Sequence, residues 1–196
     1  VKSKVVLVHH SKVIDDTGRI QQPLVQKMVD KAVTVFSGEN TLKDAWSKYF
    51  SAEDVVGFKV NTLGLMDLRG MDLLQHFPAV ANAIAYGLKK AGVKEENMII
   101  WDRSDEELAQ AGFTINNEPT SMRILGNKKS RRGPEGQFNP KSYPVGDSSS
   151  RVSSILADMC TSRINIPVPK THSNASFTCS LKNHYGTIDN PREFHP

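Results

Sequence analysis

Residues 55–61 read VVGFKVN, and residues 98–103 read MIIWDR. Each stretch is a short apolar run that ends in polar or charged side chains, which is typical of a buried strand leading into a loop. Between the two, residues 72–91 carry apolar side chains at helical spacing, and Gly92 is suited to end such a helix in the left-handed conformation. A strand, a long helix and a second strand in this order predict a βαβ unit of a parallel sheet.

Further strands and helices are predicted on both sides of this unit. Apolar and β-branched runs predict additional strands at residues 5–9, 122–125 and 163–168. Helical spacing of apolar residues, or capping signals, predict further helices at residues 23–36, 42–50, 104–112, 153–159 and 176–185. Residues 128–150 are rich in Pro, Gly and Ser, and we expect them to form a long loop.

The alternation of strands and helices predicts the fold class. We expect residues 1–196 to form a single α/β domain, whose mostly parallel sheet is flanked by helices in Rossmann-like βαβ units. The chain starts at Val1, and its last residues, NPREFHP at positions 190–196, have the character of a loop. We therefore expect the sequence to be the N-terminal portion of a longer chain.

Composition excludes several classes of protein. The chain has 196 residues, 38% of them hydrophobic, which suffices for a buried core, and no apolar run reaches the roughly 18–20 residues of a membrane span. Cys160 and Cys179 form no Cys-x-x-Cys motif, so neither a disulfide scaffold nor an iron–sulfur cluster is expected within this chain. The basic run at residues 128–132 lacks interleaved aromatic residues, and we expect a solvated loop and no nucleic-acid partner.

Polar side chains follow the predicted strands of the sheet, at residues 9–11, 59–61, 102–103 and 170–172. Ligands of parallel sheets gather at the carboxyl ends of the strands, so we expect the functional site there. Lys170, His172, Lys182 and His184 form the densest polar group and can bind an anion, ligate a metal or supply an acid–base pair. A solvated basic edge is the alternative interpretation. Lys59 is costly to bury in an apolar strand without a partner, unless it reaches water at the strand end.

Three short motifs resemble those of a large microbial family described as a domain of unknown function. They are a Lys-x-Asn strand end at residues 59–61, Pro-x-x-Lys-Thr-His at residues 167–172 and Lys-Asn-x-x-Gly at residues 182–186. The resemblance runs in order from about residue 37 onward and implies an α/β fold. Many members are exported by the twin-arginine route, and others carry ferredoxin-type clusters. The resemblance therefore implies a periplasmic or extracellular location after signal removal, with a cytoplasmic one as the alternative.

The same resemblance bears on the fold and on the chemistry. Family members usually continue past the segment at residues 190–195, which implies that C-terminal elements of the sheet are missing here. The fold organisation is also distantly similar to the amino-terminal part of nickel-pincer lactate racemases, in which lysine and histidine hold an organometallic cofactor. Fold alone does not carry function, so this similarity only suggests how lysine and histidine side chains could act.

Together these observations define the candidate site. The candidate catalytic residues are His172, His184, Lys170 and Lys182; the candidate cofactor-binding residues are Lys59, Asn61, Asp102 and Asn183; the candidate metal ligands are His172, His184 and His195. We expect an enzyme of redox or isomerase type that uses a metal ion or an anionic cofactor of unknown identity. The alternative is a non-catalytic module that binds a small anion or a metal. A homo-oligomer and a redox partner are both left open.

Overall fold

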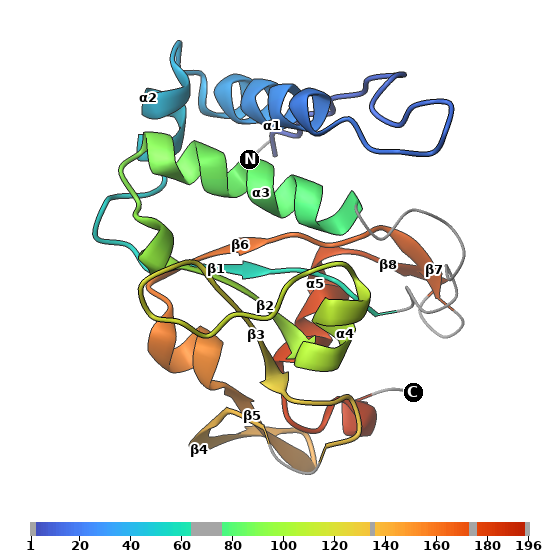
Figure 1. Ribbon diagram of the computed structural model, residues 1–196. Helices are drawn as coiled ribbons and strands as arrows, with labels where there is room; N and C mark the ends of the chain where they lie inside the picture. The colour runs from blue at the N-terminus through green and yellow to red at the C-terminus, as the bar shows by residue number, and fades with distance from the viewer. Residues whose placement is uncertain (1–2, 64–75, 134–135, 173–175, 195–196) are drawn as a thin grey trace.

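The computed structural model describes residues 3–63, 76–133, 136–172 and 176–194 (Figure 1). Within them, four strands form a sheet in the order β3-β2-β1-β6. These strands are β1 (Val56–Lys59), β2 (Met98–Ser104), β3 (Arg123–Lys128) and β6 (Ser162–Asn165). Every neighbouring pair in this sheet is parallel, which confirms the predicted α/β fold.

Three helices cover one side of the sheet (Figure 1). They are α1 (Gln22–Ser37), α2 (Leu42–Ser47) and α3 (His76–Lys90). α3 connects β1 to β2, and α4 (Asp105–Gln110) connects β2 to β3. The helix boundaries follow the expected signals, because Thr41 Oγ1 accepts a hydrogen bond from the backbone N–H of Asp44, and Ser104 Oγ accepts one from that of Glu107.

The two faces of the sheet carry separate apolar clusters, as strand alternation requires. Phe58 and Ile100 point to the helical side and belong to the same cluster as Leu88 of α3. Ile99 and Trp101 point to the opposite side and cluster with Ile155 of the π-helical turn η3 (Ile155–Met159). Lys59 follows Phe58 and therefore emerges on the same side as Trp101, whose ring its ammonium approaches to 5.6 Å.

The strand order reverses direction beside β1. β2 and β3 follow β1 on one side, whereas β6 lies on its other side. Such a reversal is a topological switch point, and ligands of open parallel sheets bind outside the carboxyl ends of the strands at this place. Lys59 and Asn165, the last residues of β1 and β6, are partners in the strand register. The topology thus places both residues at the switch point.

Two small antiparallel hairpins and several short helices complete the described chain. The hairpins are formed by β4 (Phe138–Val145) with β5 (Ser148–Ser153), and by β7 (Lys170–His172) with β8 (Ser176–Thr178). The short helices are η2 (Glu95–Asn97), α5 (Ser180–Asn183), η4 (His184–Thr187) and η5 (Pro191–Phe194). In the part of the chain that is described, no helix has both the length and the apolar character to span a bilayer.

Three predicted elements are wrong. Residues 5–9 form no strand, and Val5 and Leu7 are exposed, because none of the described strands pairs with this apolar run. Residues 138–153 form a hairpin where a long loop was expected over 128–150; its prolines are tolerated because each strand has only one partner. Residues 176–185 begin as strand β8, and only residues from 180 onward are helical. Parts of the expected loop and helix at residues 64–75 lie outside the described residues.

We expect Gly126→Ala to destabilise the fold. A Cβ atom at this position would lie 2.2 Å from the backbone C of Ser104 and 2.3 Å from the backbone N of Asp105. Those backbone atoms begin α4 and cannot move without disturbing the register of β2 and β3, so overpacking should cost about 1–3 kcal/mol. Urea denaturation measures the change in unfolding free energy. Gly133→Ala is the control, since its nearest neighbour is the movable Ser130 hydroxyl at 3.2 Å, and equal losses in the two variants would contradict the packing argument.

Candidate functional site

The carboxyl ends of β1 and β6 are joined by the side chain of Asn183, the last residue of α5. Its Nδ2 donates to the backbone O of Lys59 at 3.0 Å and to Asn165 Oδ1 at 2.7 Å. Its Oδ1 accepts a hydrogen bond from Lys59 Nζ at 3.1 Å. Because Asn183 is buried, this one amide fixes the short helix over the switch point of the sheet.

The ammonium group of Lys59 is buried and fully hydrogen-bonded. Only 2% of the residue is exposed. Its Nζ donates to Asp102 Oδ1 at 2.6 Å, to the backbone O of Val60 at 2.8 Å and to Asn183. An ammonium carries three protons, and here each has an acceptor within the protein. Lys59 therefore has no proton left for a hydrogen bond to a ligand.

The carboxylate of Asp102 completes this buried pair. Its Oδ2 accepts hydrogen bonds from the backbone N–H of Thr62 at 2.8 Å and from the Thr62 hydroxyl at 2.6 Å. Burial opposes ionisation, but the charge of Lys59 and the hydrogen bonds from Lys59 and Thr62 outweigh it and keep the pKa of Asp102 below its ordinary value. The pair is thus ionised at neutral pH and neutral overall.

Gly186 lies directly against the buried pair. A Cβ atom there would lie 3.0 Å from Asp102 Oδ1 and 3.2 Å from Lys59 Nζ, so a side chain would press on the ion pair. The carbonyl of Gly186 accepts a hydrogen bond from Asn127 Nδ2 of β3 at 2.8 Å, and Asn127 in turn accepts one from the hydroxyl of Ser153 in β5. The absence of a side chain at position 186 lets the segment after α5 close over the pair.

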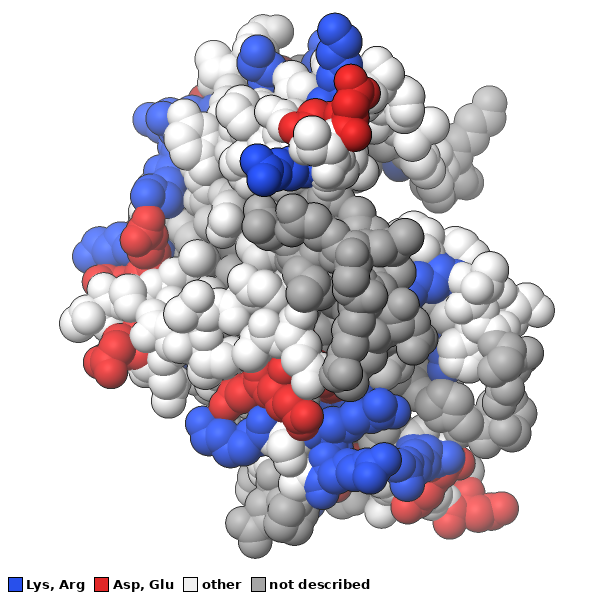
Figure 2. Space-filling model, turned by 45° about the vertical axis from the view of Figure 1, so that its right-hand side comes forward, with Lys and Arg blue, Asp and Glu red and all other residues white. Residues whose placement is uncertain are grey.

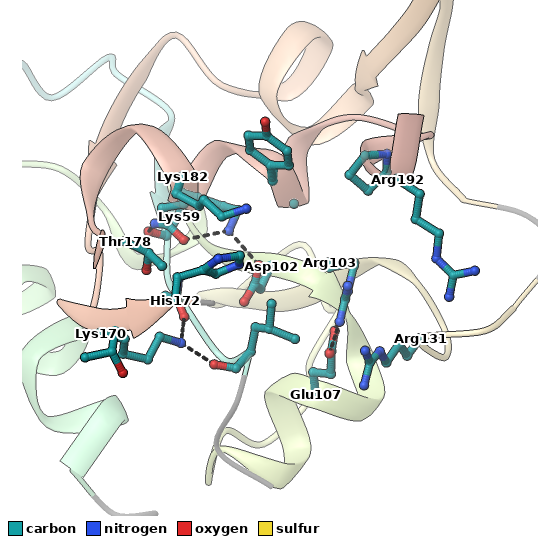
Figure 3. Close-up of a pocket in the computed structure, with 17 residues that line it drawn as sticks. Lys59, Asp102, Arg103, Glu107, Arg131, Lys170, His172, Thr178, Lys182 and Arg192 are labelled. Carbon is teal, nitrogen blue, oxygen red and sulfur yellow. Dashed lines mark hydrogen bonds and ion pairs between the residues drawn. The ribbon is translucent and has the colours of Figure 1, made fainter. Parts of the chain in front are cut away.

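A cavity of about 450 Å³ opens beside the pair (Figure 3). It lies at the carboxyl ends of the strands, as the topology predicts. Among the described residues its cationic lining side chains are Lys59, Arg103, Arg131, Lys170, Lys182 and Arg192, and its acidic ones are Asp102 and Glu107. The lining is therefore strongly basic. On the face shown in Figure 2, Lys and Arg side chains also gather in its lower part, next to acidic ones.

Both carboxylates of the cavity are engaged within the protein. Asp102 binds Lys59, and Glu107 holds the guanidinium of Arg103 through two hydrogen bonds, one of them from Nε at 2.9 Å. Ser104 Oγ donates to the same Glu107 carboxylate at 3.0 Å. Within the described residues, Lys170, Arg131 and Arg192 form no ion pair with a carboxylate. These three side chains supply positive charge that is available to a ligand in the cavity.

Lys170 of β7 is half-buried at the edge of the cavity. Its ammonium donates to Asn61 Oδ1 at 2.7 Å and to the backbone O of Leu63. Burial lowers the pKa of Lys170 and the charge of Lys59 lowers it further, while Asp102 opposes this. Lys170 therefore ties the β7–β8 hairpin to the loop after β1 and presents a positive charge held by neutral oxygens.

Of the candidate histidines that the structure describes, one lines the cavity and the other does not. His172 lines the cavity, whereas His184 of η4 is half-buried and is not among the residues that line it. Burial, then the charges of Lys59 and Arg163, lower the pKa of His184, so its imidazole is neutral at pH 7. His195 lies outside the described residues. Among those described, no three His, Cys, Asp or Glu side chains are grouped to hold a metal ion.

Most candidate site residues do come together. Those that line the cavity are Lys59, Asn61, Asp102, Lys170, His172, Lys182 and Asn183. Of the candidate residues that the structure describes, His184 is the one left outside. Thr62 and Arg192 were not singled out from the sequence, Gly186 was named only as the end of a motif, and Arg131 only as part of the basic run expected to be a solvated loop. Gly186 could have been found, since it ends the Lys-Asn-x-x-Gly motif. Arg131 lies in the loop after β3 and Arg192 in η5, and the positions of both depend on the tertiary fold.

We expect Asp102→Asn to destabilise the protein strongly. The substitution leaves the Lys59 charge buried without its counter-ion, which should cost about 3 kcal/mol or more in urea denaturation. The control is Glu95→Gln, which removes the exposed pair with Lys89 and should leave stability nearly unchanged. A similar small loss in both variants would show that the buried pair is not a stabilising element.

The same carboxylate should make the folded protein less stable as the pH becomes acidic. The pKa of Asp102 is lower in the folded protein than its ordinary value of 3.8, which applies to the unfolded chain. The stabilisation due to Asp102 is therefore complete above pH 3.8 and is lost as the pH falls through the lower pKa of the folded protein. Denaturation midpoints measured from neutral pH down through this range should fall in the wild type. In Asp102→Asn the denaturation midpoint should fall less over the same pH range, because the contribution of Asp102 is absent. An equal fall in the wild type and in this variant would contradict the role given to Asp102.

Comparison with known proteins bears on this site directly. The family model described as Domain of unknown function (DUF362) matches residues 59–196, a span that starts at Lys59 and includes every cavity-lining residue named above. No curated protein and no solved structure matches the chain. The similarity to nickel-pincer racemases stays a prediction. Since the family model covers well over half of the sequence, the chain belongs to the family described as a domain of unknown function, DUF362.

Proposed function

We propose that the domain binds a small anionic ligand in the cavity at the carboxyl ends of β1 and β6. The observation that carries this proposal is the charge of the lining. Its two described carboxylates, Asp102 and Glu107, are already paired with Lys59 and Arg103. Lys170, Arg131 and Arg192 of the lining form no ion pair with a described carboxylate. A positive cavity next to a neutral buried pair favours carboxylate or phosphate groups.

Lys170 is the side chain best placed to contact the ligand. It is half-buried, and its two described acceptors are the neutral oxygens of Asn61 and Leu63. A charge held by neutral oxygens at a partly desolvated site attracts an anion more strongly than an exposed lysine would. Lys59 contributes by balancing the charge of Asp102, which would otherwise repel an anion, because its own protons are occupied within the protein.

We further propose that the ligand is the substrate or anionic cofactor of an enzyme. The observation that favours this extension is His172, which lines the same cavity as the buried pair. An imidazole at this place can donate or accept a proton near neutral pH, as redox and isomerase reactions require. Metal binding that involves His195, and export from the cytoplasm, remain predictions.

Titration calorimetry with inorganic phosphate at constant ionic strength tests anion binding. We expect one saturable site, and we expect Lys170→Met to weaken it at least about tenfold, since a charge-assisted hydrogen bond is worth about 1.5–3 kcal/mol. The control is Lys27→Met on the exposed face of α1, which should bind as the wild type does. Lys182→Met provides a second cavity variant, and urea denaturation checks that each variant is folded. No saturable binding to the folded wild type, or equal affinity in Lys170→Met, would overturn the proposal.

The depressed pKa of Lys170 predicts how phosphate affinity varies with pH. As the pH rises, this ammonium should lose its proton below the ordinary lysine value of 10.5, and affinity should fall with it. Lys170→Arg keeps the charge at these pH values and should shift the loss of affinity upward. Affinity that is constant up to the ordinary lysine range would show that Lys170 does not hold the anion.

A further inference from the structure

The cationic side chains of the cavity form two groups on opposite sides of it (Figure 3). One group, here called the lysine end, contains Lys170 and Lys182 together with His172. The other, here called the arginine rim, contains Arg131 and Arg192. Lys170 and Lys182 are half-buried, whereas Arg131 and Arg192 are exposed. The cavity therefore has a recessed positive end and a positive mouth.

Tyr185 connects the two groups. The Lys182 ammonium lies 4.2 Å from the centre of its ring. Its hydroxyl donates to the backbone O of Phe194 at 2.8 Å, and Phe194 ends η5, the short helix that carries Arg192. One aromatic residue of the lining thus reaches from the lysine end to the helix of the arginine rim. A ligand that spans both groups would find an aromatic surface along its middle.

The arginine rim is suited to bind an anion of its own. The guanidinium of Arg103, which lies nearby in Figure 3, is held by Glu107 through Nε and Nη2, so its charge is already paired with a carboxylate. The loop that carries Arg131 is positioned by its backbone N–H, which donates to Glu106 Oε2 at 3.1 Å. A guanidinium presents a planar fork of donors that matches carboxylate and phosphate groups. Arg131 and Arg192 can therefore take a second anionic group at the mouth.

We propose that the ligand of this cavity is an elongated molecule with two anionic groups. One group binds at the lysine end, the second binds at the arginine rim, and the segment between them packs along Tyr185. This inference rests on the proposed function and names the class of its ligand. A volume of about 450 Å³ is within the range of cavities that hold small organic molecules and exceeds what a single inorganic anion fills.

Calorimetric titration of two matched probe series tests the proposal. One series consists of α,ω-alkanediol bisphosphates of increasing chain length, and the other of alkyl monophosphates of the same lengths, all at constant ionic strength. We expect the best bisphosphate to bind at least about tenfold more tightly than its monophosphate, because the second group binds intramolecularly. The double variant Arg131→Met/Arg192→Met should lose this gain while it keeps the monophosphate affinity. Lys170→Met should weaken both series.

The matched control is Arg132→Met, which removes the exposed arginine next to Arg131 that is not among the cavity-lining residues. This variant should still bind the bisphosphates more tightly than the monophosphates, by the same factor as the wild type. Equal binding of both series to the wild type, or a gain that survives loss of Arg131 and Arg192, would overturn the two-anion proposal and leave anion binding intact. Failure of the folded wild type to bind either series would overturn the proposed function itself.

Discussion

The ion pair between Lys59 and Asp102 is the constraint on which the rest of the site depends. Removing an ammonium and a carboxylate from water costs several kcal/mol for each ion, and only close pairing with complete hydrogen bonding offsets this. Both residues are at least 95% buried, and their atoms approach to 2.6 Å. The remaining hydrogen-bonding capacity is used by Val60, Thr62 and Asn183. Satisfying the pair therefore fixes the end of β1, the loop that follows it and the end of α5 in one arrangement.

This arrangement explains why a basic cavity forms at the switch point. Asn183 and Gly186 bring the segment after β8 over the ends of β1 and β6, and that segment carries Lys182. Because the charge of Asp102 is balanced by that of Lys59, Asp102 does not neutralise the other cationic side chains around the cavity. The pair is neutral, and Lys170, Arg131 and Arg192 of the lining form no ion pair with a described carboxylate, so the cavity is positive without exposing its own counter-ion. The family model begins at Lys59, the residue at the centre of this arrangement.

Local sequence patterns predict the strands of the sheet and the site residues at the strand ends. The positions of the other site residues depend on tertiary contacts. β1, β2 and β6 are predictable because apolar runs identify buried strands, and Lys59 and Asp102 stand out as charges at strand ends. Their pairing depends on the parallel register of β1 and β2, which no local pattern encodes. Arg131 reaches the cavity from the loop after β3 and Arg192 from η5, and only the folded chain brings these two segments together. The β4–β5 hairpin was missed because Pro140 and Pro144 argue against strands, although a two-stranded hairpin accepts them.

A double-mutant cycle on the buried pair tests this account most directly. The unfolding free energies of the wild type, Lys59→Met, Asp102→Leu and the double variant are measured by urea denaturation. If the pair organises the site, each single variant leaves an uncompensated buried charge, and the double variant is more stable than the sum of the two losses implies, by about 2–3 kcal/mol. Losses that add to within about 0.5 kcal/mol would show that the two charges do not depend on each other and would contradict the account.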